Sequence, residues 1–131
     1  NMNVLLAEDN ELNAEIAQAL LESEGVMVTR AANGNEVVVL YLSHPAGSFD
    51  AILMDIMMPG MDGYEATRAI RLSKKADAAD IPIIALTANA FAEDAKAAHD
   101  AGMNAHLSKP LDFNKLKNIL ARIKKNGPVS L

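Results

Sequence analysis

Cysteine is absent from this 131-residue sequence. Its absence excludes disulfide bonds, thiolate metal sites and a cysteine nucleophile. Long apolar runs are absent too. None approaches the ~20 residues that a transmembrane helix needs, and nothing resembles a signal peptide. These absences favour a cytoplasmic protein that makes no membrane contact.

Positive charge is also in short supply. The chain carries 12 lysine and arginine residues against 17 aspartate and glutamate residues, for a formal net charge of -5. A general nucleic-acid binder normally presents a basic face, so this charge argues against direct nucleic-acid binding. The length predicts one domain with a single core.

The segment from Asp50 to Gly63 is the most informative stretch of the chain. Residues 51–54 are all apolar and are followed closely by Pro59 and Gly60. Such a short run is typical of a strand buried on both faces of a parallel sheet. Asp55 then places a carboxylate where the strand should end, and ligands collect at that edge of open α/β sheets. Taken alone, Asp55 would be interpreted as a simple strand end.

Short apolar strands and amphipathic helices alternate five times along the chain. In the first helix, for example, Leu12, Ile16 and Ala17 recur at helical spacing. The intervals suit right-handed βαβ crossovers, so we expect an α/β fold. It would be a doubly wound sheet of five parallel strands in the flavodoxin-like order 2-1-3-4-5, with its core over about residues 3–125. The expected strands are 4–7, 26–29, 51–54, 82–86 and 104–107, and the expected helices are 11–24, 35–43, 64–73, 92–101 and 113–125.

Reactive side chains follow four of the five predicted strands. Glu8 and Asp9 follow the first, Asp55 the third, Thr87 the fourth and Lys109 the fifth. Three converging carboxylates repel one another unless a cation neutralises them, and oxygen ligands without histidine or cysteine favour Mg²⁺. An aspartate held against such an ion can attack phosphorus, while a lysine offsets charge on the transferring oxygens. A threonine hydroxyl can follow the phosphoryl group.

Each of these residues also has an ordinary explanation. Glu8 and Asp9 could be an exposed acidic cluster before a helix, Thr87 could cap the next helix, and Lys109 could be a solvated charge. Singly, each ordinary explanation is the better one. The occurrence of all these side chains together, at the ends of different predicted strands, is much less probable by chance. The sequence therefore favours a site for one phosphoryl group.

Four motifs together resemble the receiver domain of bacterial two-component response regulators. They are Asp9, the segment 55–63, the segment 86–88 and the segment 107–110. The resemblance covers the chain from about Asn3 to Ile123. It implies that Asp55 is the phosphoacceptor, and that Glu8 and Asp9 hold Mg²⁺ together with Asp55 and the backbone carbonyl of Met57.

The same resemblance assigns roles to the later motifs. Thr87 would be the hydroxyl that turns toward the phosphoryl group, helped by the backbone amide of Ala88. Lys109 would pair with the phosphoryl group, and its bond to Pro110 would be cis.

The family's switch residue, three positions before the lysine, is commonly Tyr or Phe, and here it is His106. An imidazole can still rotate inward, but it is polar and titrates near neutral pH. Alternatively, His106 is a partly exposed edge-strand residue with no signalling role. The sequence leaves both interpretations open.

A finer resemblance concerns the larger protein. The segments Glu8–Asn13 and Thr87–Ala90 are similar to receiver domains of hybrid sensor histidine kinases, more than to those fused to DNA-binding regulators. The chain also opens with Asn1 before Met2, and its first strand starts almost at once. We therefore expect residues 1–131 to be a single receiver domain cut from a longer hybrid kinase. A stand-alone response regulator is the alternative.

The resemblance implies a phosphorylation switch that takes phosphate from a histidine kinase or a histidine-phosphotransfer domain and promotes its own phosphorylation and dephosphorylation. Two other functions fit less well. An Mg²⁺-dependent phosphatase with an aspartyl nucleophile would need a second aspartate two residues on, where Met57 stands. A flavodoxin-like cofactor binder would need a phosphate loop after the first strand, which is absent. Whether the domain also forms a weak homodimer stays open.

Overall fold

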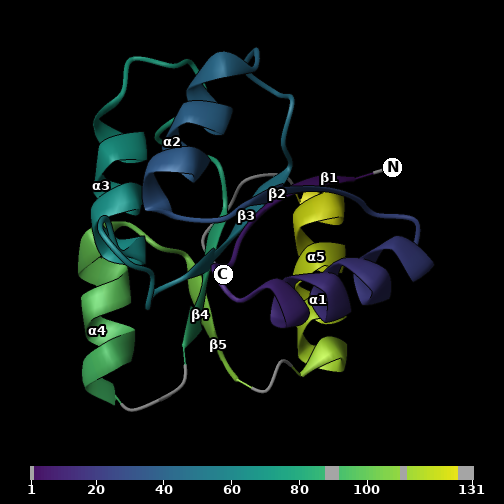
Figure 1. Ribbon diagram of the computed structural model, residues 1–131. Helices are drawn as coiled ribbons and strands as arrows, with labels where there is room; N and C mark the ends of the chain where they lie inside the picture. The colour runs from purple at the N-terminus through teal and green to yellow at the C-terminus, as the bar shows by residue number, and fades with distance from the viewer. Residues whose placement is uncertain (1, 88–91, 110–111, 127–131) are drawn as a thin grey trace.

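The computed structural model describes residues 2–87, 92–109 and 112–126. Figure 1 shows a central sheet with helices on both sides. The strands are β1 (Asn3–Ala7), β2 (Met27–Ala31), β3 (Ala51–Asp55), β4 (Ile83–Thr87) and β5 (Ala105–Ser108). The helices are α1 (Glu11–Ser23), α2 (Gly34–Ser43), α3 (Gly63–Leu72), α4 (Ala92–Ala101) and α5 (Phe113–Asn126). None of these helices is both long and apolar enough to cross a membrane.

The sheet confirms the predicted topology. All four strand pairs are parallel, and the order is β2-β1-β3-β4-β5. Alternate strand residues face opposite layers of the core. Leu5 and Ile52 pack in the layer with α2, α3 and α4, whereas Leu6 and Leu53 pack in the layer with α1 and α5. Figure 1 shows these two groups of helices on opposite sides of the sheet. Every residue of β3 and β4 is buried, as the continuous apolar runs predicted.

Side-chain caps start the helices that follow β1, β2 and β3. The Asn10 side chain accepts a hydrogen bond from the Asn13 amide at 2.9 Å, and Asn33 and Asp62 cap α2 and α3 in the same way. Gly63 is required at the start of α3, because a Cβ atom there would overlap the Asp55 carbonyl. The helix therefore begins directly against the end of β3.

Two details differ from the sequence-based expectation. Four strands end later than predicted, β2 by two residues and β3, β4 and β5 by one each. At β4 and β5 the pairing continues because the Lys109 amide still donates to the Thr87 carbonyl at 2.7 Å. The helical spacing in α1 is real, but Leu12 and Ile16 are 64% and 53% exposed. The helix packs on the sheet through Ala14, Ala17 and Leu21, so Leu12 and Ile16 remain on the surface.

Arg71 joins several loops at the amino ends of β4 and β5. Its Nη1 donates to the Ala78 and Ile81 carbonyls, and its Nε and Nη2 both donate to the Gly102 carbonyl. Nη2 also donates to Asn104 Oδ1 at 2.9 Å. All five guanidinium N–H groups are thereby used, so Arg71 is a structural residue that holds these connections in place.

Candidate functional site

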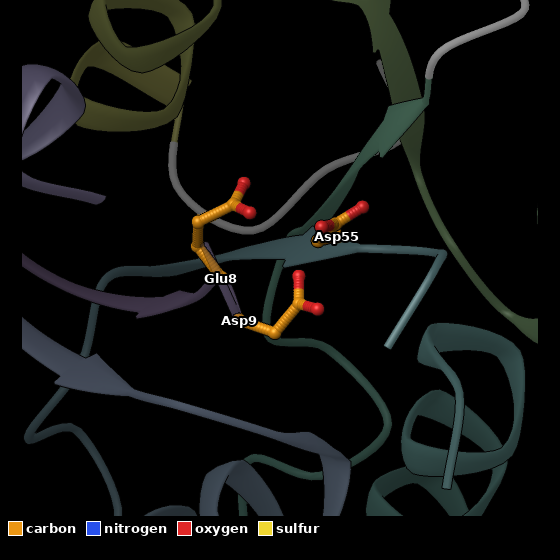
Figure 2. A group of neighbouring side chains, drawn as sticks. All are labelled: Glu8, Asp9 and Asp55. Carbon is orange, nitrogen blue, oxygen red and sulfur yellow. The ribbon is translucent and has the colours of Figure 1, made fainter. Parts of the chain in front are cut away.

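Three carboxylates meet at the carboxyl edge of the sheet (Figure 2). Glu8 and Asp9 follow β1, and Asp55 is the last residue of β3. One oxygen from each lies within 4.8 Å of the others. Glu8 and Asp55 are 3% and 2% exposed, whereas Asp9 is open to solvent. The sequence predicted this convergence from strand ends alone.

Lys109, which follows β5, bridges two of these carboxylates. Its Nζ lies 3.0 Å from Glu8 Oε2 and 2.9 Å from Asp55 Oδ2. One ammonium thus serves two buried carboxylates, and with Asp9 the cluster keeps a surplus of negative charge. Such a surplus can be offset by a bound cation.

Burial raises the pKa of Asp55 from its ordinary 3.8 to about 6, and the nearby Glu8 charge adds to the rise. The Lys109 hydrogen bond opposes this increase without cancelling it. Burial would lower the pKa of Lys109, but its bonds to Asp55 and Glu8 outweigh that effect and raise it. At neutral pH Lys109 is therefore charged and Asp55 is mostly ionised, which is the state a nucleophile requires.

The two acidic residues after β1 are held very differently. Glu8 Oε1 accepts from the Asn10 amide at 3.1 Å while Oε2 pairs with Lys109, so both oxygens are engaged. The Asp9 carboxylate has neither a hydrogen bond nor an ion pair within residues 2–87, 92–109 and 112–126. Asp9 is therefore the acid most available to an incoming cation.

The predicted residues around Asp55 occupy distinct positions. The Met57 amide donates to Asp55 Oδ1 at 3.2 Å, and the Met57 side chain is 72% exposed. Thr87 is the buried last residue of β4, and its carbonyl accepts from the Lys109 amide. Ala88 and Pro110 lie outside the described residues, so their predicted roles remain predictions.

His106 is not part of the acidic cluster's cavity. It pairs with Ala85 in the middle of β5 and lines a separate cavity of about 160 Å³ under α4, together with His99 and Met103. A larger cavity of about 250 Å³ reaches from Glu8 and Lys109 along α1 to Ile16. The site thus opens toward α1, while the predicted switch position faces α4.

One residue of this edge was missed by the sequence argument. Arg30, near the end of β2, donates from Nε and Nη2 to the Glu8 carbonyl at 3.3 and 3.0 Å. The signal was present, because Arg30 also stands at the carboxyl end of a predicted strand. No sequence pattern shows that its guanidinium reaches a backbone oxygen of another segment.

Three carboxylates and a lysine at the carboxyl edge of a flavodoxin-like sheet define an acidic site of the receiver type. The comparisons agree: the chain belongs to the response regulator receiver domain family, whose model matches residues 4–121. It is 38% identical over 125 residues to hybrid signal transduction histidine kinase L of Dictyostelium discoideum. That match covers 95% of this chain and 7% of the kinase, so the chain spans a small part of such relatives.

Two solved structures extend the comparison. The receiver domain of sensor histidine kinase PA1611 from Pseudomonas aeruginosa, with a magnesium ion in its active-site cleft, is 42% identical with a TM-score of 0.82. That alignment covers 93% of this chain and 96% of the other. The second is the Saccharomyces cerevisiae receiver domain of Ssk1, solved with the histidine phosphotransfer protein Ypd1. It is 27% identical with a TM-score of 0.84, over 98% of this chain and 92% of the other.

Proposed function

We propose that this chain is a phosphoacceptor domain in two-component signalling, with Asp55 accepting a phosphoryl group from a phosphohistidine. The observation that carries the proposal is the Asp55 carboxylate itself. It is buried, held between the Met57 amide and Lys109, and lies beside two further carboxylates. Family membership supports the same conclusion.

The transfer is a displacement at phosphorus. One Asp55 oxygen forms the new P–O bond, and the P–N bond of the phosphohistidine breaks with its electron pair staying on the imidazole nitrogen. The product is an acyl phosphate on Asp55 and a free histidine. Lys109, already 2.9 Å from Asp55, is positioned to offset the charge on the phosphoryl oxygens.

Magnesium fits the donor set of this site. All the side-chain donors are carboxylate oxygens, and their charge exceeds that of the single lysine. Asp9 and Asp55, with Glu8 and the backbone carbonyl of Met57, would hold the ion. When bound, Mg²⁺ supplies positive charge that neutralises the phosphoryl oxygens. The magnesium-bound PA1611 receiver supports this assignment.

The response to phosphorylation would run through the end of β4. Thr87 is buried next to Ser108 in the sheet, and its carbonyl is tied to the Lys109 amide. A phosphoryl group on Asp55 would compete for Lys109 and attract the Thr87 hydroxyl, with the Ala88 amide assisting. The arrangement that binds the phosphoryl group better then becomes the populated one. Whether His106 takes part stays a prediction.

The proposed partner is a histidine kinase or histidine-phosphotransfer domain that docks beside α1. Leu12 and Ile16 of α1 and Met57 are large, exposed apolar side chains, and Ile16 lines the same cavity as Glu8 and Lys109. Apolar surface next to a charged site suits a protein partner that must bring a phosphohistidine to Asp55. The Ypd1 complex is a precedent among similar receivers.

We further propose that residues 1–131 are one receiver domain of a longer hybrid histidine kinase and act in the cytoplasm, where ATP-dependent kinases form phosphohistidine. The support is the kinase relatives, of which the chain spans 7% and 13% in two cases.

Intact-protein mass after incubation with acetyl phosphate and Mg²⁺ tests the proposal. We expect one phosphoryl group on the wild type and on the control Asp80→Asn, whose side chain is exposed and remote from the site. Asp55→Asn should carry none. An Mg²⁺-independent adduct, or one retained by Asp55→Asn, would overturn the assignment.

A further inference from the structure

Arg30 contacts the acidic site through the backbone of Glu8. It lies in β2 opposite Leu6 of β1, and Leu6 precedes Glu8 by two residues. Two of its guanidinium nitrogens, Nε and Nη2, converge on one carbonyl oxygen, at 3.3 and 3.0 Å. The Glu8 amide in turn donates to the Ala31 carbonyl at 3.1 Å. β2 therefore holds Glu8 on both sides of its Cα.

The Glu8 carbonyl belongs to the peptide unit that leads into Asp9. A peptide unit is planar, so fixing its oxygen also fixes the direction in which the Asp9 nitrogen and Cα leave it. The Asp9 carboxylate makes no hydrogen bond or ion pair within the described residues, so its orientation depends on its backbone. Planar donation through two N–H groups is a property of arginine that lysine lacks.

We propose that Arg30 is a positioning residue, which aims the Asp9 carboxylate into the cation site by fixing the Glu8–Asp9 peptide. This inference rests on the proposed Mg²⁺-dependent function. Arg30 touches none of the three carboxylates in the structure and acts through the main chain alone.

The direction in which Mg²⁺ affinity changes when Arg30 is removed distinguishes a positioning role from a purely electrostatic one. A guanidinium near a cation site repels the cation, so removing it by charge alone would strengthen Mg²⁺ binding. Removing a group that orients a ligand weakens binding, by about 10-fold at the lower end for supporting groups of metal ligands. The two effects are opposed, and positioning predicts the second.

The experiment compares Arg30→Met, Arg30→Lys and Arg68→Met in the whole chain. Arg68 is exposed on α3 and makes no side-chain hydrogen bond or ion pair with the described residues, so its removal controls for net charge. Mg²⁺ binding is followed by amide chemical shifts, and the rate of phosphorylation by acetyl phosphate is measured against Mg²⁺ concentration. Thermal unfolding without Mg²⁺ checks that each variant is folded.

We expect the Mg²⁺ concentration for half-saturation to rise about 10-fold in Arg30→Met, with the rate at saturating Mg²⁺ kept. Arg30→Lys should behave like Arg30→Met although it retains the charge, and Arg68→Met should match the wild type. Unchanged or tighter Mg²⁺ binding in Arg30→Met would overturn the proposal, as would full rescue by lysine.

Failure of the underlying function would look different. A wild type that binds no Mg²⁺ refutes the Mg²⁺-dependent function, and with it the role of Arg30 in cation binding. If the wild type binds Mg²⁺ but Arg30→Met leaves amide exchange at Asp9 and Asn10 unchanged, the function stands and the positioning role fails.

Discussion

Two aspartates at opposite ends of the sheet have opposite electrostatic surroundings. At the amino end, Asp77 Oδ1 accepts from the Tyr41 hydroxyl at 2.5 Å and Oδ2 accepts from the Gly47 amide at 3.0 Å. At the carboxyl end, Asp55 shares Lys109 with Glu8 and lies beside Asp9. Asp77 thus has a donor for each oxygen, while the Asp55 cluster has more acids than cations.

The pKa values follow this difference. Burial would raise the pKa of both aspartates. For Asp77 the hydrogen bonds from Tyr41 and Gly47 and the nearby Lys75 outweigh burial, and its pKa is lowered. For Asp55 burial and Glu8 prevail, and its pKa rises to about 6. A fully satisfied carboxylate stabilises the fold, whereas one with surplus negative charge beside it is prepared to take a cation or a phosphoryl group.

The largest expected effect comes from removing Lys109, the cation that pairs with both Glu8 and Asp55. Lys109→Met should slow phosphorylation by acetyl phosphate by about 100-fold, because the transferring oxygens lose their fixed positive partner. Lys74→Met, at an exposed position of the loop after α3, should react like the wild type. Rates are measured by intact mass over time at saturating Mg²⁺. Equal rates in both variants would show that Lys109 has no part in the reaction.

Asp55→Asn tests the surplus charge through stability. Because the folded pKa is about 6 and the ordinary value 3.8, the folded state keeps a proton that the unfolded chain loses between these values. The stability from Asp55 is complete below pH 3.8 and is lost as the pH rises through 6. Asparagine cannot ionise. Without Mg²⁺, the unfolding free energy of Asp55→Asn should therefore exceed that of the wild type by an amount that grows from pH 4 to pH 6 and then levels off, on the order of 1–3 kcal/mol.

Thermal or urea unfolding at pH 4.5 and pH 7.5 measures this advantage. Saturating Mg²⁺ at pH 7.5 should reduce it, since the ion binds only the folded wild-type site. An advantage that does not vary with pH would mean that the buried charge of Asp55 is already compensated.

Tyr41→Phe tests the opposite end of the sheet. The change removes the hydroxyl that donates a hydrogen bond to Asp77 and leaves the buried ring in place. We therefore expect a loss of about 1–2 kcal/mol in unfolding free energy. Phosphorylation by acetyl phosphate should be unchanged. Slower phosphorylation in this variant, with unchanged stability, would contradict the assignment of the amino end of the sheet to stability and of the carboxyl end to function.

The smallest effect is expected for an ion pair on the surface. Lys117 Nζ and Glu24 Oε1 lie 3.0 Å apart, but both side chains are more than 40% exposed. Glu24→Gln should therefore change the unfolding free energy by no more than about 0.5 kcal/mol. A larger loss in urea unfolding would show that the contact between α1 and α5 depends on this pair.

The sequence predicted the fold and the acidic edge for a physical reason. Parallel strands all end at the same edge, so locating the strands already locates Glu8, Asp55 and Lys109 together. The short apolar runs indicated the strands, and the helical spacing of apolar residues indicated the helices between them.

What could not be predicted depends on contacts between distant segments. No local pattern indicates that the Lys109 ammonium contacts both Glu8 and Asp55, or that Arg30 donates to the backbone oxygen of Glu8, just after the neighbouring strand β1. Helical spacing likewise identified α1 without showing that Leu12 and Ile16 point outward, since that depends on how closely the helix approaches the sheet.

Two glycines, Gly34 and Gly63, allow the starts of two helices to approach the loop after Asp55 closely. A side chain at Gly63 would overlap the Asp55 carbonyl, and one at Gly34 would overlap the Met61 carbonyl. The starts of α2 and α3 therefore pack directly against this loop, with no room for a side chain between them. A residue larger than glycine at either position would push on this loop, so both glycines help to fix where the loop lies relative to the Asp55 carboxylate.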